Sequence, residues 1–191
     1  MSTLGTHSDT LVLALQPATA TAIAPYGTLI AAGGSTPRTS SFYGDAVQLW
    51  TPGQFISDAD TTLSVARVHS RPCEVIWMER HFRHTQCFLP LSGRPFAVVL
   101  GLANERPAPD AHTVKAFRFD GSAGLMMHIG TWHEFPFALE GDTEVLIILR
   151  NETNRDLEVR EGEEAIGGDL EKRNLRIRLG HTFSFDPTGV P

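Results

Sequence analysis

Short extended runs repeat through the middle of this chain, and they constrain its fold more than any other feature. The runs recur about every 8–12 residues, and turn signals such as Pro52-Gly53 and Asp120-Gly121 separate them. We predict strands at 47–50, 63–68, 74–79, 86–91, 96–100, 115–119, 125–129, 135–139 and 144–149. Because no long amphipathic helix interrupts them, the pattern favours an all-β antiparallel sandwich or barrel.

The start of the chain departs from this pattern. A strand at 11–15 precedes the alanine-rich stretch 17–24, which predicts a short helix that ends at Pro25 and Gly27. We expect one domain over residues 1–191, with a core at about 11–150 and a charged C-terminal extension at 151–191.

The C-terminal extension is expected to be peripheral. Apolar and polar residues alternate at 157–159 and 175–178, which predicts exposed edge strands or a hairpin. The stretch Phe183-Ser184-Phe185 is expected to be a loose apolar end that docks on a partner subunit. The chain shows no internal repeat and no low-complexity segment.

Composition excludes several classes of protein. The 191 residues suffice for one domain with a core, and a formal charge of −6 disfavours a nucleic-acid or anionic-membrane partner. No apolar run approaches the roughly 20 residues that span a bilayer, and the first residues lack a signal-peptide pattern. Cys73 and Cys87 form no CxxC pair, so we expect a cytoplasmic protein without a disulfide framework.

Polar side chains gather on two of the predicted strands. Glu79 and His81 are two residues apart, so on an extended strand both side chains point to the same face. Gln86 follows His81 by five residues and Gly93 by seven more, and a separate Gly-x-x-His ends at His133. We expect the four polar side chains to converge in one pocket.

This spacing resembles the two motifs of the cupin superfamily. The first motif reads His-x-His, four residues, Glu, six residues and Gly, and Glu79 and Gln86 stand in at two of its positions. The second motif has a Gly three residues before a His, as at His133. The resemblance implies a cupin-like antiparallel β-barrel, or jelly roll, with a short N-terminal helix and a C-terminal extension.

Two kinds of chemistry suit these four side chains. Imidazole nitrogens and carboxylate oxygens bind divalent metals well, whereas an amide oxygen is a weaker ligand. Glu79, His81, Gln86 and His133 are therefore either ligands of a divalent ion, with Ni, Zn and Mn as candidates, or a metal-free acid–base set in which Gln86 orients the substrate. A buried polar network without any function is the third alternative, which the matched spacing disfavours.

Two more residues are assigned to substrate binding. A guanidinium holds a carboxylate by two parallel hydrogen bonds, and Arg67, at the end of an apolar run, is the arginine best placed to bind a small organic acid. Trp132 is the second residue assigned to substrate binding, although packing at the mouth of a barrel would also explain a tryptophan at this position. Arg80 is expected to face outward because it alternates with Glu79 and His81.

Alternation also removes several residues from the predicted site. His84 and Glu134 are expected on the face opposite to the pocket, and His128 on the surface or behind the site. Cys87 is predicted to be a small buried side chain and not a nucleophile, because no adjacent base is evident.

Several strings resemble the ureidoglycolate lyase family, and together they span about residues 11–150. The strings are Glu79-Arg80-His81, Thr85-Gln86, Phe88-x-Pro90-x-x-Gly93, Trp132-His133, Pro25-Tyr26-Gly27 and Ala66-Arg67. The resemblance implies an enzyme, usually a homodimer, that cleaves ureidoglycolate to glyoxylate and urea late in the breakdown of allantoin and purines. Some members of the family are described as metal-dependent.

The chain departs from the family pattern shortly before His133. Where the family tends to read Gln-Gly-Val-Asn-Tyr, this chain reads Ala123-Gly124-Leu125-Met126-Met127, so three polar side chains become apolar. Methionine cannot read a ureido group by strong hydrogen bonds. Three alternatives stay open: a paralogue that acts on another small carboxylic acid, a cupin that binds such an acid without turnover, and a metal-dependent cupin enzyme of other chemistry.

The expected reaction is an elimination from a carbon that bears a hydroxyl, a carboxylate and a ureido nitrogen. It needs a base on the hydroxyl, an acid on the leaving nitrogen and a cation on the carboxylate. We assign His133 or Glu79 as the base, His81 as the acid or a metal ligand, Gln86 as the group that orients the substrate, and Arg67 as the carboxylate anchor.

Overall fold

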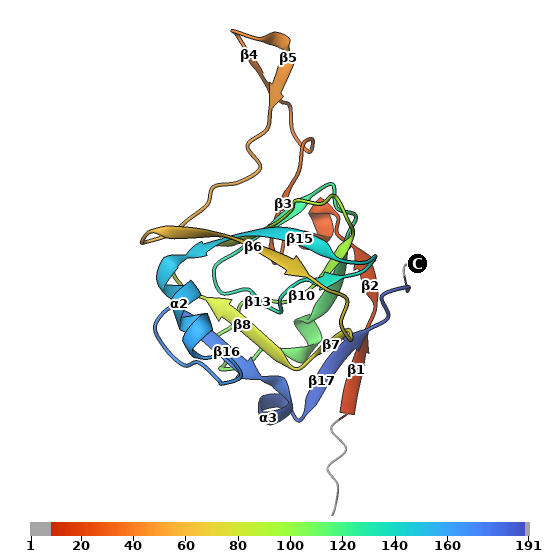
Figure 1. Ribbon diagram of the computed structural model, residues 1–191, viewed down its shortest axis with the longest axis vertical. Coiled ribbons are helices and arrows are strands. Elements are labelled where there is room, and N and C mark those ends of the chain that lie inside the picture. The colour runs from red at the N-terminus through yellow and green to blue at the C-terminus, as the bar shows by residue number, and fades with distance from the viewer. Residues whose placement is uncertain (1–8, 190–191) are drawn as a thin grey trace, which may run out of the picture.

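The protein, seen in a computed structural model that describes residues 9–189, is built mostly from β-strands in several sheets (Figure 1). The strands are β1 (Asp9–Leu13), β2 (Leu15–Pro17), β3 (Gly27–Ile30), β4 (Arg38–Ser40), β5 (Gly44–Leu49), β6 (Thr61–Val68), β7 (Glu74–Val75), β8 (Trp77–His81), β9 (Gln86–Pro90), β10 (Phe96–Gly101), β11 (Lys115–Phe119), β12 (Gly124–Met127), β13 (Trp132–His133), β14 (Phe137–Ala138), β15 (Thr143–Arg150), β16 (Leu170–Asn174) and β17 (His181–Phe185). The helices are α1 (Ala20–Ile23), the 3-10 turn η1 (Ala111–Thr113), α2 (Asn151–Val159) and α3 (Leu175–Leu179). Within the described residues no sheet closes into a barrel.

Most of the predicted extended runs are strands, and the short N-terminal helix is also confirmed. The run predicted at 115–119 coincides with β11, whereas the run at 74–79 is split between β7 and β8. Helix α1 begins after Thr19, whose Oγ1 accepts a hydrogen bond from the backbone nitrogen of Ala22 at 3.2 Å. This N-cap satisfies one of the free amide groups of the first turn.

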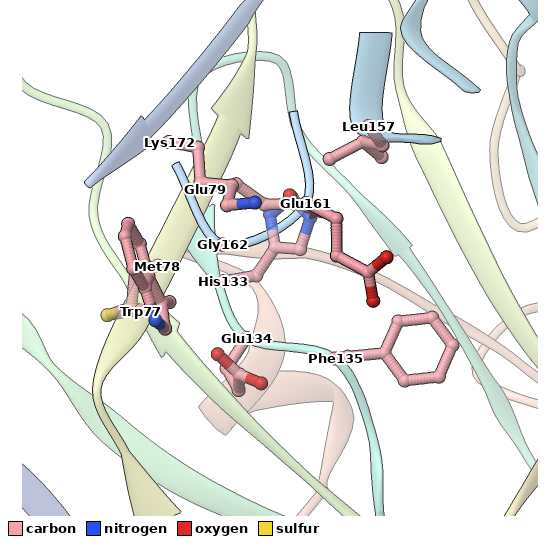
Figure 2. Close-up of a pocket in the computed structure, with 10 residues that line it drawn as sticks. All are labelled: Trp77, Met78, Glu79, His133, Glu134, Phe135, Leu157, Glu161, Gly162 and Lys172. Carbon is pink, nitrogen blue, oxygen red and sulfur yellow. Dashed lines mark ion pairs between the residues drawn. The ribbon is translucent and has the colours of Figure 1, made fainter. Parts of the chain in front are cut away.

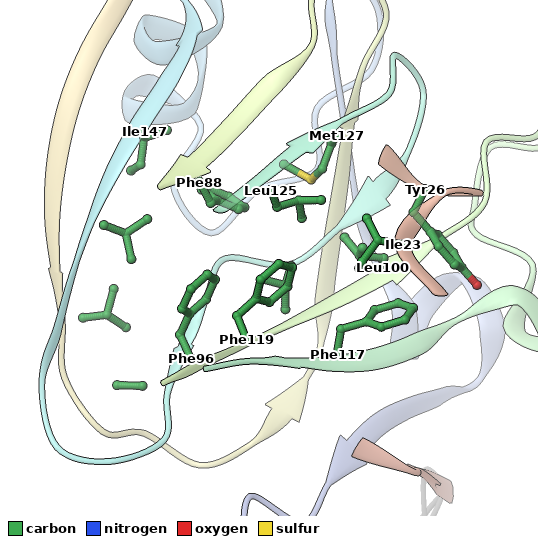
Figure 3. Packing of buried hydrophobic residues seen from close by; sticks show 14 of the residues in the cluster. Ile23, Tyr26, Phe88, Phe96, Leu100, Phe117, Phe119, Leu125, Met127 and Ile147 are labelled. Carbon is green, nitrogen blue, oxygen red and sulfur yellow. The ribbon is translucent and has the colours of Figure 1, made fainter. Parts of the chain in front are cut away.

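The main hydrophobic core lies between two large sheets (Figure 3). One sheet has the strand order β16-β8-β13-β10-β11-β2 with β14 beside β10, and the other has the order β3-β12-β9-β15-β6. Phe88 from the second sheet packs in the same buried cluster as Phe96 and Phe117 from the first. Each such fully buried side chain stabilises the fold by about 1.5–3 kcal/mol, so this layer holds the two sheets together.

A second core covers the opposite face of the seven-stranded sheet. Trp132 and Phe137 from that sheet pack with Phe183 and Phe185 of β17, and β17 forms a three-stranded sheet with β1 and β7. The seven-stranded sheet is therefore buried on both faces. This explains why β10 is apolar throughout and shows no alternation.

The C-terminal segment corrects two predictions. Residues 157–159 belong to α2 and residues 175–178 to α3, so neither stretch is an edge strand. The side chain of Asn174 caps α3 by accepting from the nitrogen of Ile177, and Gly180 ends it with a positive φ of 76°. Phe183 and Phe185 are not a loose end either, because both are buried within this chain.

Strands β4 and β5 form a hairpin that projects from the body (Figure 1). At its tip, Phe42 is 85% exposed and Tyr43 is 61% exposed, and their rings meet edge to face. The hairpin pairs with no other strand of the described residues. Among those residues, no helix is long and apolar enough to cross a membrane.

Candidate active site

Strand pairing brings Glu79 and His133 together. β13 runs antiparallel to β8, and His133 lies directly opposite Glu79 in the register. Residues that are directly opposite on neighbouring strands point to the same face of a sheet. Since His81 follows Glu79 by two residues on β8, all three side chains face the space between the two large sheets.

Gln86 reaches the same space from the other sheet. It begins β9 and lies opposite Met127, which is part of the core between the sheets. The Gln86 side chain is therefore directed inward, and its Oε1 is buried without a hydrogen-bond partner in the part of the chain that the structure describes. The structure thus places the four residues predicted for the pocket in the space between the two large sheets.

Three atoms of metal-ligand type converge at the centre of the site. His133 Nδ1 lies 3.0 Å from the backbone oxygen of Thr131, and because a carbonyl only accepts, Nδ1 carries a proton. In the neutral imidazole, His133 Nε2 then presents its lone pair, 3.5 Å from Oε1 of Glu79. His81 Nε2 lies 3.9 Å from the same oxygen, and the two imidazole rings are 5.1 Å apart between centroids.

The electrostatics keep these groups in their metal-binding forms. Burial lowers the pKa of His81 to about 3, and the neighbouring His133 adds to the effect, so the imidazole is neutral near pH 7. Burial alone would raise the pKa of the Glu79 carboxyl, but a hydrogen bond with His133 and the charge of its protonated ring outweigh burial and hold that pKa below its usual value. Glu79 is therefore a carboxylate.

A divalent cation fits this donor set. Ligands at about 2.1 Å from a tetrahedral ion lie about 3.4 Å from each other, close to the separations of 3.5 and 3.9 Å measured from Glu79 Oε1. Among residues 9–189, neither ring nitrogen of His81 has a hydrogen-bond partner, and both nitrogens are buried. Glu79, His81 and His133 would hold the ion, with Oε1 of Gln86 facing them from the second sheet.

His84 also belongs to the interior, which corrects the prediction from strand alternation. Its ring stacks on His81 with centroids 4.7 Å apart, and its Nδ1 lies 2.9 Å from Oδ2 of Asp169. β8 ends at His81, so the alternating phase is lost before residue 84. Although His81, His84 and Asp169 also form a possible ligand group, Asp169 already accepts hydrogen bonds from the backbone nitrogens of residues 82 and 83.

Glu79 and His133 open onto a pocket of about 460 Å³ (Figure 2). The side chains that line it come from β8, from the segment after β13, and from the C-terminal segment: Trp77, Met78, Glu79, His133, Glu134, Phe135, Leu157, Glu161, Gly162 and Lys172. His81 and Gln86 lie behind this surface. A cavity of this volume suits a small organic molecule.

Glu134 lines the pocket, contrary to the prediction that placed it on the far face. β13 ends at His133, and the backbone nitrogen of Glu134 donates to Val99, so the strand phase does not continue. Burial raises the pKa of the Glu134 carboxyl to about 7, although Arg71 Nη2 at 3.0 Å from its Oε1 opposes the shift.

Arg67 and Trp132 lie elsewhere. The Arg67 side chain is 66% exposed and pairs with Glu144 at 2.7 Å on the outer face of the five-stranded sheet. Trp132 is fully buried in the second core, with the guanidinium of Arg80 4.4 Å from its ring centroid. Arg80 does occupy the face opposite to Glu79, as expected, but it is buried there and paired with Glu171, not exposed.

The structure also locates two methionines, one cysteine and one histidine for which the sequence made predictions. Met127 faces the core between the sheets, while Met126 lies on the other side, close to Gly53, so only one of the two methionines is near the interior site. Cys87 is buried, as predicted, and burial raises the pKa of its thiol to about 11. His128 is exposed.

Sequence reasoning missed the contributions of the C-terminal segment. Leu157, Glu161 and Lys172 line the pocket, and Asp169 binds His84. Residues 170–174 read Leu-Glu-Lys-Arg-Asn, which shows no alternation of apolar and polar residues, and no local signal shows that they form a strand paired with β8.

A family model and individual relatives that match this chain carry the same description. The family model described as ureidoglycolate lyase matches residues 10–167. A protein named ureidoglycolate lyase from Azotobacter vinelandii is 32% identical over 149 residues, which are 73% of this chain and 86% of that protein. Another with that name, from Brucella anthropi, is 31% identical over 159 residues, 80% of this chain and 89% of its own length.

Proposed function

This chain belongs to the ureidoglycolate lyase family, and from that premise we propose that it cleaves ureidoglycolate to glyoxylate and urea at the Glu79–His81–His133 site. The reaction is that of a carbon–nitrogen lyase in allantoin breakdown. The observation that carries the assignment is the convergence of Glu79, His81 and His133 beside a pocket of suitable size.

The reaction moves one proton within the substrate. A base takes the proton of the hydroxyl group, the aldehyde carbonyl of glyoxylate forms, the bond from that carbon to nitrogen breaks, and the departing nitrogen gains a proton to give urea. In the metal-free alternative, Glu79 and His133, whose facing atoms lie 3.5 Å apart at the pocket, are the groups that would take and return this proton.

The neutral state of His81 favours a ligand role over an acid role. An imidazole whose pKa is lowered to about 3 holds no exchangeable extra proton near pH 7. A divalent ion bound by Glu79, His81 and His133 would polarise the substrate hydroxyl and lower its pKa, with Ni, Zn and Mn as the candidate metals. Gln86 would orient the bound groups through its unpaired Oε1.

We propose that the two large sheets are the walls of a cupin-like barrel in a single domain, and that the protein is a homodimer. The projecting β4–β5 hairpin supports the dimer. An isolated two-stranded hairpin is at best marginally stable in water, and here Phe42 and Tyr43 are exposed at its tip. Leu63 and Val65, 67% and 61% exposed on the outer face of β6, offer an apolar surface on a second copy.

Release of glyoxylate tests the function directly. The purified protein is mixed with ureidoglycolate, and glyoxylate is measured after chelation and after addition of Ni²⁺, Zn²⁺ or Mn²⁺ in turn. We expect release well above background that falls on chelation and returns with one of the ions. No release under any of these conditions, together with thermal stabilisation by small acids, would instead favour the binding protein without turnover.

A further inference from the structure

We propose that Lys172 binds the carboxylate of the substrate and so gives the pocket its preference for small acids. The inference rests on the proposed function and adds to it the residue that recognises the acid group. Lys172 lies on β16, beyond residues 10–167 that match the family. The anchor is therefore supplied by the C-terminal segment of this chain.

Strand register places Lys172 in line with the site. β16 runs antiparallel to β8, and Lys172 lies directly opposite Glu79, just as His133 lies opposite Glu79 on the other side. Lys172, Glu79 and His133 thus form one row across three neighbouring strands, and residues in such a row point to the same face. Figure 2 shows Lys172 extending beside Glu79 over the pocket.

The ammonium group of Lys172 is held in place by one hydrogen bond and has further donors for a ligand. The backbone of Lys172 exchanges two hydrogen bonds of 3.1 Å with Ala165, and its Nζ donates to the backbone oxygen of Arg160 at 2.9 Å. Nζ also lies 5.3 Å from the ring centroid of Trp77. An ammonium has three donors, and the described residues show an acceptor for one of them.

The charges of the residues that line the pocket favour Lys172 as the group that binds an anionic substrate. Glu79, Glu134 and Glu161 all line the pocket, and of its described lining residues only Lys172 is a lysine or an arginine. Arg71 lies outside the lining, and its Nη2 is already paired with Glu134. A monoanionic substrate that enters among carboxylates needs a positive group close to its own carboxylate. Arg67 does not supply that group, because it is paired with Glu144 on the outer face of the other sheet.

Substitution of the two lysines of this chain tests the proposal. Lys172→Met keeps the apolar stem against Trp77, Lys172→Gln keeps a donor for the Arg160 carbonyl, and Lys172→Arg keeps the charge. Lys115→Met, at an exposed position on β11, is the matched control. We expect the Met and Gln variants to raise the KM for ureidoglycolate by about tenfold or more with a smaller change in kcat, while the Arg and Lys115 variants stay close to the parent.

Product inhibition separates recognition from mere stabilisation. Glyoxylate carries the carboxylate and urea does not, so loss of Lys172 should weaken inhibition by glyoxylate about as much as it raises KM, and leave inhibition by urea unchanged. Equal weakening of both inhibitors, or unchanged KM and glyoxylate inhibition in a folded Met or Gln variant, would overturn the proposal.

The failure of this proposal can be told apart from failure of the proposed function. If the parent protein releases no glyoxylate, the function fails, and calorimetric titration with glyoxylate alone then decides the role of Lys172. Binding to the parent and to Lys115→Met, but not to Lys172→Gln, supports the anchor. Equal binding to all three, or no binding to any, contradicts it.

Discussion

At the residue scale, His133 Nε2 lies 3.5 Å from Glu79 Oε1, and this contact explains most of the expected behaviour. Such a contact is favourable only when a proton or a cation lies between the two atoms. His81 Nε2 lies 3.9 Å from the same Glu79 oxygen. The three atoms therefore form a site whose favourable state is an occupied one.

Glu79→Gln should remove both metal and activity. The substitution keeps the shape of the side chain but loses the negative charge, so we expect kcat/KM for ureidoglycolate to fall by about a hundredfold or more. Metal content, measured by mass spectrometry of the purified protein, should fall in parallel. Glu163→Gln, at an exposed position, should change neither value, and a metal-loaded, fully active Glu79→Gln variant would contradict the assignment.

Asp169 acts at the residue scale as the support of His84. Its carboxylate accepts from the nitrogens of Phe82 and Arg83 at 3.0 and 2.7 Å, and it pairs with His84 and Thr153. It thereby fixes the turn that follows β8.

Asp169→Asn should lower the free energy of unfolding by about 2 kcal/mol or more, because an amide cannot satisfy all of these buried donors at once. Urea unfolding curves measure the loss. Asp60→Asn, at an exposed site, should stay within about 0.5 kcal/mol of the parent. Equal stability of the two variants would mean that the Asp169 network contributes nothing.

At the scale of elements, the β4–β5 hairpin is notable because it projects from the body of the protein (Figure 1). It pairs with no other described strand, and its aromatic tip is exposed. The physical expectation is that a second copy covers it, since exposed aromatic rings at the tip of a hairpin favour association.

Replacing the tip should separate the subunits. We expect the double variant Phe42→Ser, Tyr43→Ser to sediment as a monomer and the parent protein to sediment as a dimer in sedimentation velocity experiments. The exposed pair Val159→Ser, Ile166→Ser on the C-terminal segment controls for a general loss of apolar surface. A parent protein that is monomeric at micromolar concentration would refute the dimer.

At the scale of the whole molecule, the C-terminal segment completes the fold. β16 adds an outer strand next to the site, and β17 closes the second core with Phe183 and Phe185. Together with β1 and β7, this segment covers the apolar second face of the seven-stranded sheet.

Phe183→Ala should therefore destabilise the whole protein. Loss of a fully buried phenylalanine costs about 3–5 kcal/mol, a large part of the 5–15 kcal/mol that is typical of a folded protein. Thermal unfolding followed by circular dichroism should show a melting temperature lowered by several degrees. Ile177→Ala, at a 71% exposed position, should leave it nearly unchanged. If both variants melted alike, the segment would not belong to the core.

Local sequence patterns were sufficient to predict the strands of the body, the short helix before Tyr26, and the position of Glu79 and His81 on the same face of one strand. Those features depend on neighbours within a few residues, where the alternation of an extended chain and the turn residues act directly. Family membership could be inferred from the same local strings.

Tertiary structure alone decided which distant strands stand beside the site. The register that sets Lys172 opposite Glu79 joins residues 93 positions apart, and the contact between His84 and Asp169 spans a similar distance. Strand alternation also fails where a strand ends, as it does after His81 and after His133. Because long-range pairing depends on how whole sheets pack, no local pattern predicts it.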